Sequence, residues 1–376
     1  MKKIVFYTEK WTNGGIETFI VNAIENLDRE NYKIEIITSQ KENEIYDSRL
    51  LKLNVDLHEI HTKIFNPFIR IFKNIIQFKK TIKKIKPDII HINVYNGVGL
   101  VYAYLSSKCG IKNIICHAHN TGIDNDYFKI KKFIHTICKE IFTSSKYTYL
   151  ACTKDAAEFC FDMRKQNDVE IIRNGIDIKK FSFNETERKK IRSELNLSEN
   201  DFLIGNVGRF VPQKNHKFLI KIFVKYLKIN NNAKLILVGT GKLQRDIKEE
   251  AVRYGIEDKV LFLEMRRDIQ RIFWAMDIFI FPSKYEGLGI VLIEAQASGL
   301  KCLASTNIPK DVKVTENIDF IDIGNENIEK WVEKIKENEK YSRTYKYEEI
   351  KEKGYDKSKI GESLNKIYLR IGESDG

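Results

Sequence analysis

The chain has 376 residues, a formal net charge of +12, 43% hydrophobic residues and 31% charged residues. This length predicts two domains rather than one core, and the apolar content without a low-complexity tract excludes a disordered chain. The positive charge is compatible with nucleic acid, acidic lipid or phosphate-bearing ligands, but the sequence contains no nucleic-acid-binding motif.

The cysteine pattern and the apolar runs indicate where the protein works. Its six cysteines form no Cys-x-x-Cys pair and no group with histidine at metal-binding spacing, which argues against zinc and suits a reducing compartment. The first apolar run is too short for a signal peptide, and no later run is long enough to cross a membrane. We therefore expect a soluble cytoplasmic protein.

Strand patterns alternate with helix patterns along the chain. In the first half, strands are predicted at 3–8, 32–38, 89–93 and 113–117, and helices from 15 and over 68–86 and 99–109. After a charged stretch that ends near residue 200, strands follow at 202–207, 234–238, 260–263 and 278–281, with helices over 217–227, 243–254 and 268–275. This alternation predicts an α/β protein of two Rossmann-like, doubly wound domains. Because ligands of such sheets bind at the carboxyl ends of the strands, we expect an active cleft between the domains.

Loops in the first half offer candidate ligand contacts. Gly14 and Gly15 open a predicted helix, where glycines let backbone amides approach a phosphate or a sugar, although most Gly-Gly turns are structural. His119 follows the strand at 113–117, a position that suits catalysis, binding or a simple loop hydrogen bond. Asp124 and Asp126 match the Asp-x-Asp pattern of metal-dependent nucleotide-sugar enzymes, but they lead into a lysine-rich segment instead of following a strand. We therefore expect no metal.

The first loops of the second half carry positive charge. Arg209 ends one strand and Lys214 begins the next helix, and a guanidinium fork beside an ammonium group suits a diphosphate. Gly239 and Gly241 follow the next strand, but the third glycine of a dinucleotide fingerprint is replaced by Gln244, and no P-loop occurs. We interpret this Gly-x-Gly as a turn that lines the nucleotide side of the cleft.

The stretch after the strand at 278–281 combines a glycine-bearing turn with a helix start near Gly289 and a helix end at Gly299. A strand, a loop and a helix N-terminus form an anion-binding arrangement. Glu286 lies in the turn and Glu294 in the helix, so one extended ligand could touch both. A lone helical glutamate is more often satisfied by a backbone amide or a lysine, and we expect Glu294 to have such a partner because its surroundings are apolar.

Two basic segments leave two interpretations open. Residues 68–87 and 127–139 combine apolar residues with lysines at helical spacing. Each is either a packed helix with a solvated face or a helix that docks on an anionic membrane surface. In the second case Lys79, Lys80, Lys83 and Lys84 would contact lipid.

Taken together, these motifs resemble one known family. The residues that carry the resemblance are Gly14, Gly15, Asn174 to Asp177, Phe181, Gly208, Arg209, Phe210, Lys214, Asn215, Pro282, Ser283, Glu286, Gly287 and Glu294. They are similar to the retaining glycosyltransferases of family 4, which have the GT-B architecture of two Rossmann-like domains facing a central cleft. His119, Asn120 and residues 306–309 resemble the branch that makes bacterial capsules and exopolysaccharides. Two features depart from the family: Lys301 replaces a usual proline, and the loop after His119 is short.

The resemblance implies a role for each candidate residue. His119, Glu286, Arg209 and Lys214 would be catalytic, with Arg209 and Lys214 on the donor diphosphate and Glu286 on hydroxyls of the donor sugar. Glu294 would bind the ribose hydroxyls, and the remaining donor contacts would come from Gly14, Gly15, Gly287, Leu288, Gly289 and Ile290. No cofactor and no metal are expected. The implied domains are an acceptor-side domain over 1–178, a nucleotide-sugar domain over 179–352, and a last helix over 353–376 that crosses back to the first.

The expected function is therefore a retaining, metal-independent hexosyl transfer in cell-surface polysaccharide synthesis. The donor would be a nucleotide-diphosphate sugar, with UDP the expected nucleotide, and the acceptor a lipid-linked or growing glycan. Two alternatives stay open: another GT-B enzyme such as a nucleotide-sugar 2-epimerase, and a non-catalytic basic protein of the membrane surface. The expected partners are the donor, the acceptor and an anionic membrane surface on the inner face of the cell membrane, without nucleic acid.

Overall fold

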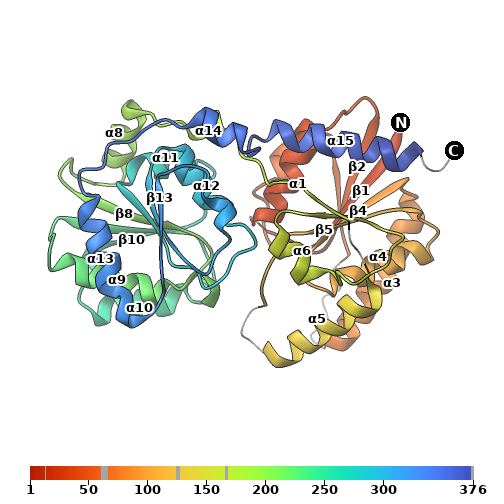
Figure 1. Cartoon of the computed structure of the whole chain (residues 1–376), viewed down its shortest axis with the longest axis horizontal. Coiled ribbons are helices and arrows are strands. Elements are labelled where there is room, and N and C mark those ends of the chain that lie inside the picture. Colours follow the sequence, from red (N-terminus) through yellow and green to blue (C-terminus); the bar gives the residue numbers. More distant parts are fainter. Residues whose placement is uncertain (13, 61–66, 124–127, 166–167, 374–376) are drawn as a thin grey trace. The chain divides into compact units, whose positions relative to one another are not determined.

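The computed structural model describes residues 1–12, 14–60, 67–123, 128–165 and 168–373. The chain forms two compact units (Figure 1). Unit 1 comprises Met1–Gly175 and Tyr355–Gly376, and unit 2 comprises Ile176–Gly354. Each unit is built on one parallel sheet, so the expected α/β class with two Rossmann-like domains is confirmed.

Unit 1 contains a seven-stranded parallel sheet in the order β3-β2-β1-β4-β5-β6-β7. Its strands are β1 (Lys2–Trp11), β2 (Tyr32–Lys41), β3 (Asp56–Glu59), β4 (Ile89–Val94), β5 (Asn113–Ala118), β6 (Thr148–Ala151) and β7 (Val169–Ile171). Every residue of β4 is buried, because helices cover both faces of a parallel sheet and leave no polar side.

The helices of unit 1 are α1 (Gly15–Asn26), α2 (Asp47–Lys52), α3 (Pro67–Ile85), α4 (Gly99–Lys108), α5 (Phe128–Phe142), α6 (Lys154–Cys160) and α15 (Ser358–Glu373). Two neighbouring residues of β1 show which helices cover each face of the sheet. Phe6 packs in the core with residues of α1 and α15, whereas the ring of Tyr7 contacts Phe78 of α3 and Tyr102 of α4. The helix α15 therefore completes unit 1 although it follows unit 2 in sequence.

Unit 2 contains a six-stranded parallel sheet in the order β10-β9-β8-β11-β12-β13. Its strands are β8 (Phe202–Val207), β9 (Ala233–Val238), β10 (Val260–Leu263), β11 (Ile278–Phe281), β12 (Lys301–Ser305) and β13 (Ile318–Ile321). Its helices are α7 (Ile178–Phe181), α8 (Glu185–Glu194), α9 (His216–Leu227), α10 (Gln244–Arg253), α11 (Ile269–Ala275), α12 (Ile290–Ala297), α13 (Ile328–Glu337) and α14 (Tyr347–Glu352).

The structure also contains elements that the sequence patterns did not predict. The charged stretch before residue 200 forms α8. Asn184 caps this helix, because its side-chain Oδ1 accepts a hydrogen bond from the Glu187 N–H (3.0 Å). Arg192 of α8 is buried and donates to the Ala275 carbonyl (2.8 Å). Because this helix packs through arginine, it lacks the apolar period by which helices are recognised.

Candidate active site

In unit 2 the strand order reverses between β8 and β11, which brings the loops after these strands together. The loop after β8 carries Lys214, and the loop after β11 carries Glu286. Gln213 Nε2 donates to the Tyr285 carbonyl oxygen (2.8 Å), and the Lys284 N–H donates to the Gln213 carbonyl oxygen (2.8 Å). These hydrogen bonds fasten the two loops to each other.

Lys214 and Glu286 form a largely buried ion pair at this point. Lys214 Nζ lies 2.7 Å from Glu286 Oε1, and the two side chains keep 13% and 9% of their surface exposed. The same Nζ lies 4.6 Å from the centre of the Phe281 ring, within cation–π distance. The fold thus places a cation and a carboxylate within reach of one ligand.

Arg209 lies in a turn that packs closely against the loop after β9. A Cβ added to Gly239 would lie 2.3 Å from the Gly208 carbonyl oxygen, so only glycine fits there. The Phe210 N–H donates to the Thr240 carbonyl oxygen (2.9 Å) and holds the turn in place. Among the residues that the structure describes, the half-buried Arg209 guanidinium has neither a hydrogen bond nor an ion pair. It is available to an anionic ligand.

The turn after β11 ends at Gly289, whose φ of +85° is a left-handed conformation that favours glycine. The helix α12 begins directly after it, and its first hydrogen bond runs from the Leu292 N–H to the Gly289 carbonyl oxygen (2.9 Å). The first N–H groups of a helix have no acceptor within it and attract negative charge. Backbone amides near Ile290 are therefore placed to meet an anion.

Glu294 lies in α12, one helical turn beyond Ile290. Burial raises the pKa of its carboxyl to about 7, and the positive charge of Lys180 in α7 opposes that shift. Within the described part of the chain, the carboxyl makes no hydrogen bond, and Lys180 is its electrostatic partner. A buried carboxyl in this state gains from a ligand that donates hydroxyl hydrogen bonds.

In unit 1, the pair Gly14 and Gly15 begins α1. The Gly14 N–H donates to Glu17 Oε2 (2.9 Å) and to Thr12 Oγ1 (3.1 Å), and a Cβ at Gly14 would lie 2.8 Å from Glu17 Oε2. The amide of Gly14 is thus already used in a capping box. An added Cβ at Gly15 would meet no atom within 4 Å, so Gly15 is the more open of the two.

His119 lies just after β5 and is 8% exposed. Its Nε2 lies 2.9 Å from Asn93 Oδ1, while Asn93 Nδ2 donates to the Tyr7 carbonyl oxygen (3.1 Å). Because Asn93 must accept at Oδ1, His119 Nε2 carries the proton and Nδ1 is a bare acceptor. That Nδ1 is buried without a partner in the described residues, and burial lowers the pKa of His119 to about 3.

A buried histidine array continues from His119 into unit 1. The His119 ring lies 4.1 Å from that of His117, whose Nδ1 lies 3.1 Å from His91 Nε2, and His91 Nδ1 lies 2.8 Å from the Tyr368 hydroxyl. Asn93, His91 and His117 were not predicted from the sequence as site residues. Their signal was the His-x-Asn and His-x-His patterns at the ends of two neighbouring strands, where Asn93 pairs in register with His117.

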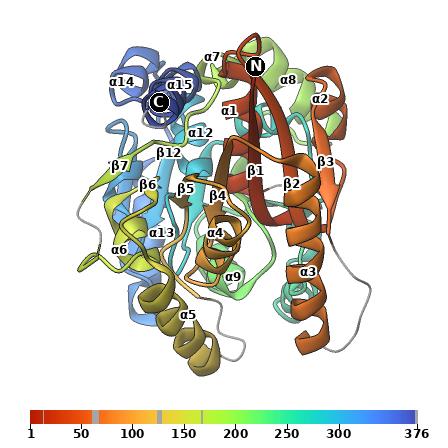
Figure 2. The same cartoon turned by 90° about the vertical axis from the view of Figure 1, so that its right-hand side faces the viewer.

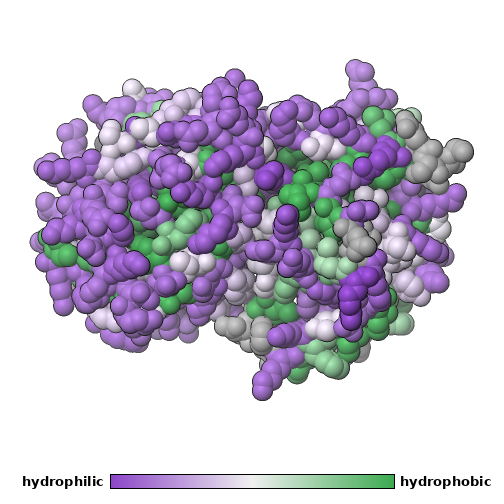
Figure 3. Space-filling view, in the orientation of Figure 1, coloured by the Kyte–Doolittle hydropathy of each residue, from purple (hydrophilic) through white to green (hydrophobic). Residues whose placement is uncertain are grey.

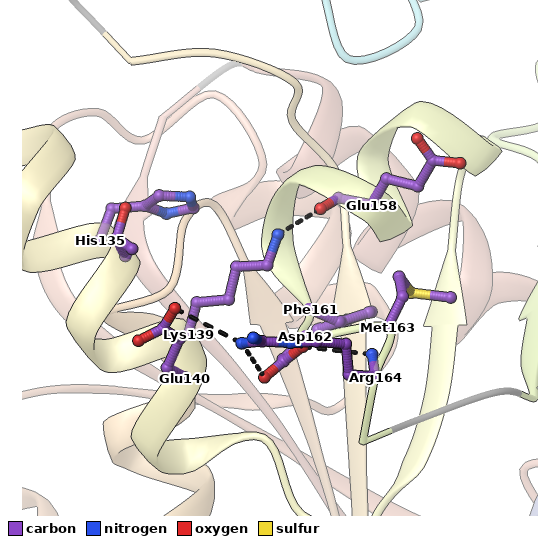
Figure 4. Close-up of a pocket in the computed structure, with 9 residues that line it drawn as sticks. His135, Lys139, Glu140, Glu158, Phe161, Asp162, Met163 and Arg164 are labelled. Atoms are coloured by element: carbon purple, nitrogen blue, oxygen red, sulfur yellow. Dashed lines mark hydrogen bonds and ion pairs between the residues drawn. The ribbon is translucent and has the colours of Figure 1, made fainter.

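The described residues offer neither a cluster of metal ligands nor a membrane-spanning helix. These contain no group of three or more histidine, cysteine, aspartate or glutamate side chains that could hold a metal ion. Asp124 and Asp126 lie outside the described residues. No helix among the described residues is long and apolar enough to cross a membrane. A cavity of about 380 Å³ lies between α5, α6 and residues 161–164, and its lining contains none of the predicted site residues (Figure 4).

Comparison with known proteins gives two family matches that together span both units. Residues 13–180 match the model described as Glycosyltransferase Family 4, and residues 187–357 match the model described as Glycosyl transferases group 1.

Individual relatives extend over most of the chain. The putative glycosyltransferase EpsF of Bacillus subtilis (strain 168) is 27% identical over 314 residues, which cover 83% of this chain and 81% of that protein. The Escherichia coli UDP-Gal:alpha-D-GlcNAc-diphosphoundecaprenol alpha-1,3-galactosyltransferase is 30% identical over 246 residues, which cover 63% of this chain and 62% of that protein. The crystal structure of Anabaena Alr3699/HepE in complex with UDP and glucose has a TM-score of 0.76 at 18% identity, covering 98% of this chain and 100% of that one. At 18% identity, the similarity to the Anabaena structure shows a shared fold alone.

Proposed function

Since the chain belongs to glycosyltransferase family 4 and has the GT-B fold, we propose that it moves a hexose from a UDP-sugar to a lipid-linked or growing glycan, with retention of anomeric configuration. The observation that carries this proposal is the Lys214–Glu286 ion pair beside Gly289 at the start of α12, with Glu294 one turn into that helix and Arg209 in the turn after β8 of the same unit. It combines the positive charge that a diphosphate needs with the carboxyl groups that sugar hydroxyls need.

In this proposal unit 2 binds the donor. Glu294 accepts hydrogen bonds from the ribose hydroxyls, and Arg209 and Lys214 contact the diphosphate. Glu286 accepts hydrogen bonds from hydroxyls of the donor sugar, while the amides of Gly287 to Ile290 contribute further donors to the phosphate. Support comes from the carboxyl of Glu294 and the guanidinium of Arg209, each of which lacks a hydrogen bond within the described residues.

Positive side chains meet the main chemical demand of the reaction. As the glycosidic bond breaks, negative charge grows on the leaving diphosphate, and preorganised cations lower the energy of that transition state. Arg209, Lys214 and the amides at the start of α12 supply positive charge from the protein itself. For retention we propose a same-face displacement in which the leaving phosphate takes the acceptor's proton.

Unit 1 would bind the acceptor. We propose the range 1–178 as the acceptor side, 179–352 as the donor side and 353–376 as the returning helix. His119 would lie beside the transferred sugar and accept a hydroxyl hydrogen bond at its bare Nδ1; the buried, unpartnered state of that atom supports this role. Gly14 and Gly15 would contribute close backbone approach to the diphosphate or the acceptor.

The acceptor class and the location follow from resemblance. A lipid-linked acceptor is named for the Escherichia coli relative, and we extend that class to this chain. We propose a cytoplasmic enzyme of cell-surface polysaccharide synthesis, in line with the capsule-type sequence features and the cysteine pattern described above.

Incubation of the purified protein with a panel of radiolabelled nucleotide sugars, with and without lipid extract, tests the function. The proposal requires label to move to lipid or glycan with release of UDP, and NMR to show the donor's anomeric configuration in the product. Conversion of the nucleotide sugar without an acceptor would instead identify a 2-epimerase. Absence of both turnover and UDP binding would overturn the enzyme assignment.

A further inference from the structure

The side of α5 that faces the protein makes both polar and apolar contacts. His135 is the one buried side chain among residues 129–142 of this helix. Its Nδ1 accepts from the Gly97 N–H (2.9 Å), and its ring stacks on Phe159 at 4.5 Å. One turn later, Lys139 Nζ donates to the Glu158 carbonyl oxygen (Figure 4). These two polar contacts, together with the Phe142 ring against Tyr104 of α4 (5.2 Å), hold α5 on unit 1.

The outward side of α5 is apolar. Its exposed residues form a stripe, called the α5 stripe below, made of Ile130 (60% exposed), Phe133 (66%), Ile134 (44%), Ile137 (37%) and Ile141 (62%). The spacing of three, four, seven and eleven residues from Ile130 puts them on one face, roughly opposite His135 and Lys139. Figure 3 shows hydrophobic surface at the lower edge of unit 1, where α5 lies. Isolated exposed apolar residues are normal in proteins, but a continuous stripe marks an interaction surface.

The neighbouring helices α3 and α4 also expose large apolar side chains. The helix α4 contacts both α3 and α5, and Figure 2 shows it between them, with α3 and α5 extending to the lower part of unit 1. Phe72 and Ile76, one turn apart in α3, are 64% and 37% exposed, and Tyr104 of α4 is 39% exposed. Large apolar groups therefore reach solvent from each of the three helices.

The charge beside the stripe favours one kind of partner. The α3 sequence has six basic residues and no acidic residue, and the α5 sequence has four basic residues and one acidic residue. Lys129 and Lys131 lie on opposite flanks of the α5 stripe and, with Lys132, are exposed. A second copy of this chain would bring like charges together, which is unfavourable. An anionic lipid surface instead matches both the apolar stripe and the lysines.

We propose that α5 is a membrane-docking helix, whose stripe enters the headgroup and acyl-chain boundary of an anionic leaflet while lysines of α5 and α3 meet the lipid phosphates. The helix lies in the membrane plane and anchors unit 1 reversibly. The inference rests on the proposed function only in the reason for docking, which is to bring the enzyme to a lipid-linked acceptor. The test below measures membrane binding and not sugar transfer.

The test is co-sedimentation of the full chain with vesicles of phosphatidylcholine alone and of phosphatidylcholine mixed with phosphatidylglycerol. Wild type is expected to bind the mixed vesicles, less so as salt rises. The double variant Phe133→Ser, Ile137→Ser should bind about tenfold more weakly or worse, because it loses two inserted side chains. The matched control is Leu51→Ser, Leu369→Ser, which removes two exposed leucines of α2 and α15 in the same unit (82% and 53% exposed) and should bind like wild type.

A second measurement reports insertion directly. Phe133→Trp should show a blue-shifted fluorescence on mixed vesicles and no shift on neutral ones. Equal binding to both vesicle types, or unchanged binding of the serine double variant, would overturn the proposal. So would a wild-type dimer that the double variant converts to monomer in light scattering, since the stripe would then be a self-association surface. UDP affinity, measured in parallel on every variant, separates this failure from failure of the proposed function.

Discussion

Replacing Glu294 by glutamine should make the protein more stable and a worse ligand binder. Below pH 4.5 the carboxyl is protonated in both the folded and the unfolded chain, so its burial does not lower the free energy of unfolding through ionisation. Between pH 4.5 and about 7 the unfolded chain loses the proton while the folded one keeps it, and the free energy of unfolding falls as pH rises. Above that range the loss is constant. The shift from 4.5 to about 7 corresponds to about 3 kcal/mol.

Glutamine keeps the shape of Glu294 but cannot ionise. The Glu294 residue keeps part of its surface exposed although protein surrounds its carboxyl, so we expect Glu294→Gln to gain about 1 to 3 kcal/mol in free energy of unfolding at pH 8.5 and little at pH 4.5. Urea unfolding at both pH values measures this difference. The control Glu333→Gln, at an exposed position on α13, should show no comparable pH-dependent gain.

The same variant should bind UDP at least about tenfold more weakly at pH 8.5, because the ionised carboxyl makes the stronger hydrogen bonds to the ribose. Calorimetric titration measures this loss. Wild-type affinity should also rise as pH increases through about 7, where the carboxyl ionises. An unfolding difference that is equal at both pH values, or wild-type UDP affinity in the variant, would refute the reasoning.

Three further predictions concern the other site residues. Lys214→Ala should lower kcat/KM about tenfold or more and lower the free energy of unfolding by about 1 to 3 kcal/mol, because it breaks the buried pair with Glu286. Steady-state kinetics and urea unfolding measure the two effects, and the control Lys217→Ala, on the exposed side of α9, should change neither quantity. Nitrogen-15 NMR should show His119 neutral with its proton on Nε2 between pH 5 and 8, since its pKa is about 3; a titration near 6.5 would contradict the buried site. Transfer should survive EDTA, and loss of activity that manganese restores would return Asp124 and Asp126 to consideration.

The double effect expected of Lys214→Ala revises an idea based on sequence alone. The resemblance seen in the sequence assigns Lys214 to the donor diphosphate alone, which predicts an effect of its loss on transfer only. In the structure, Lys214 also neutralises Glu286, and the side chain is needed without any ligand. Its rate effect and its stability effect must therefore be measured separately.

Local patterns determined much of this protein. The strand at 278–281, the glycine at 289 and the helix that follows are encoded within about twenty residues, because each depends on its own backbone preferences. The periodicity of residues 68–86 likewise predicted α3 to within a residue at each end. Short strands such as β6 and β7 were missed, since a few buried apolar residues have no distinguishing period.

Contacts between distant residues were decided only by the tertiary structure. The pairing of Lys214 with Glu286 across 72 positions arises because β8 and β11 are neighbours in the sheet, and the raised pKa of Glu294 arises because other elements bury it. The helix α5 shows the same limit most plainly. Its periodicity predicts an apolar side and a polar side but not which of them faces the protein, and burial of apolar area alone would have turned the isoleucines inward. Contacts of His135 and Lys139 with Gly97 and Glu158 hold the helix the other way round, because satisfying buried polar groups requires partners that only the folded chain brings together.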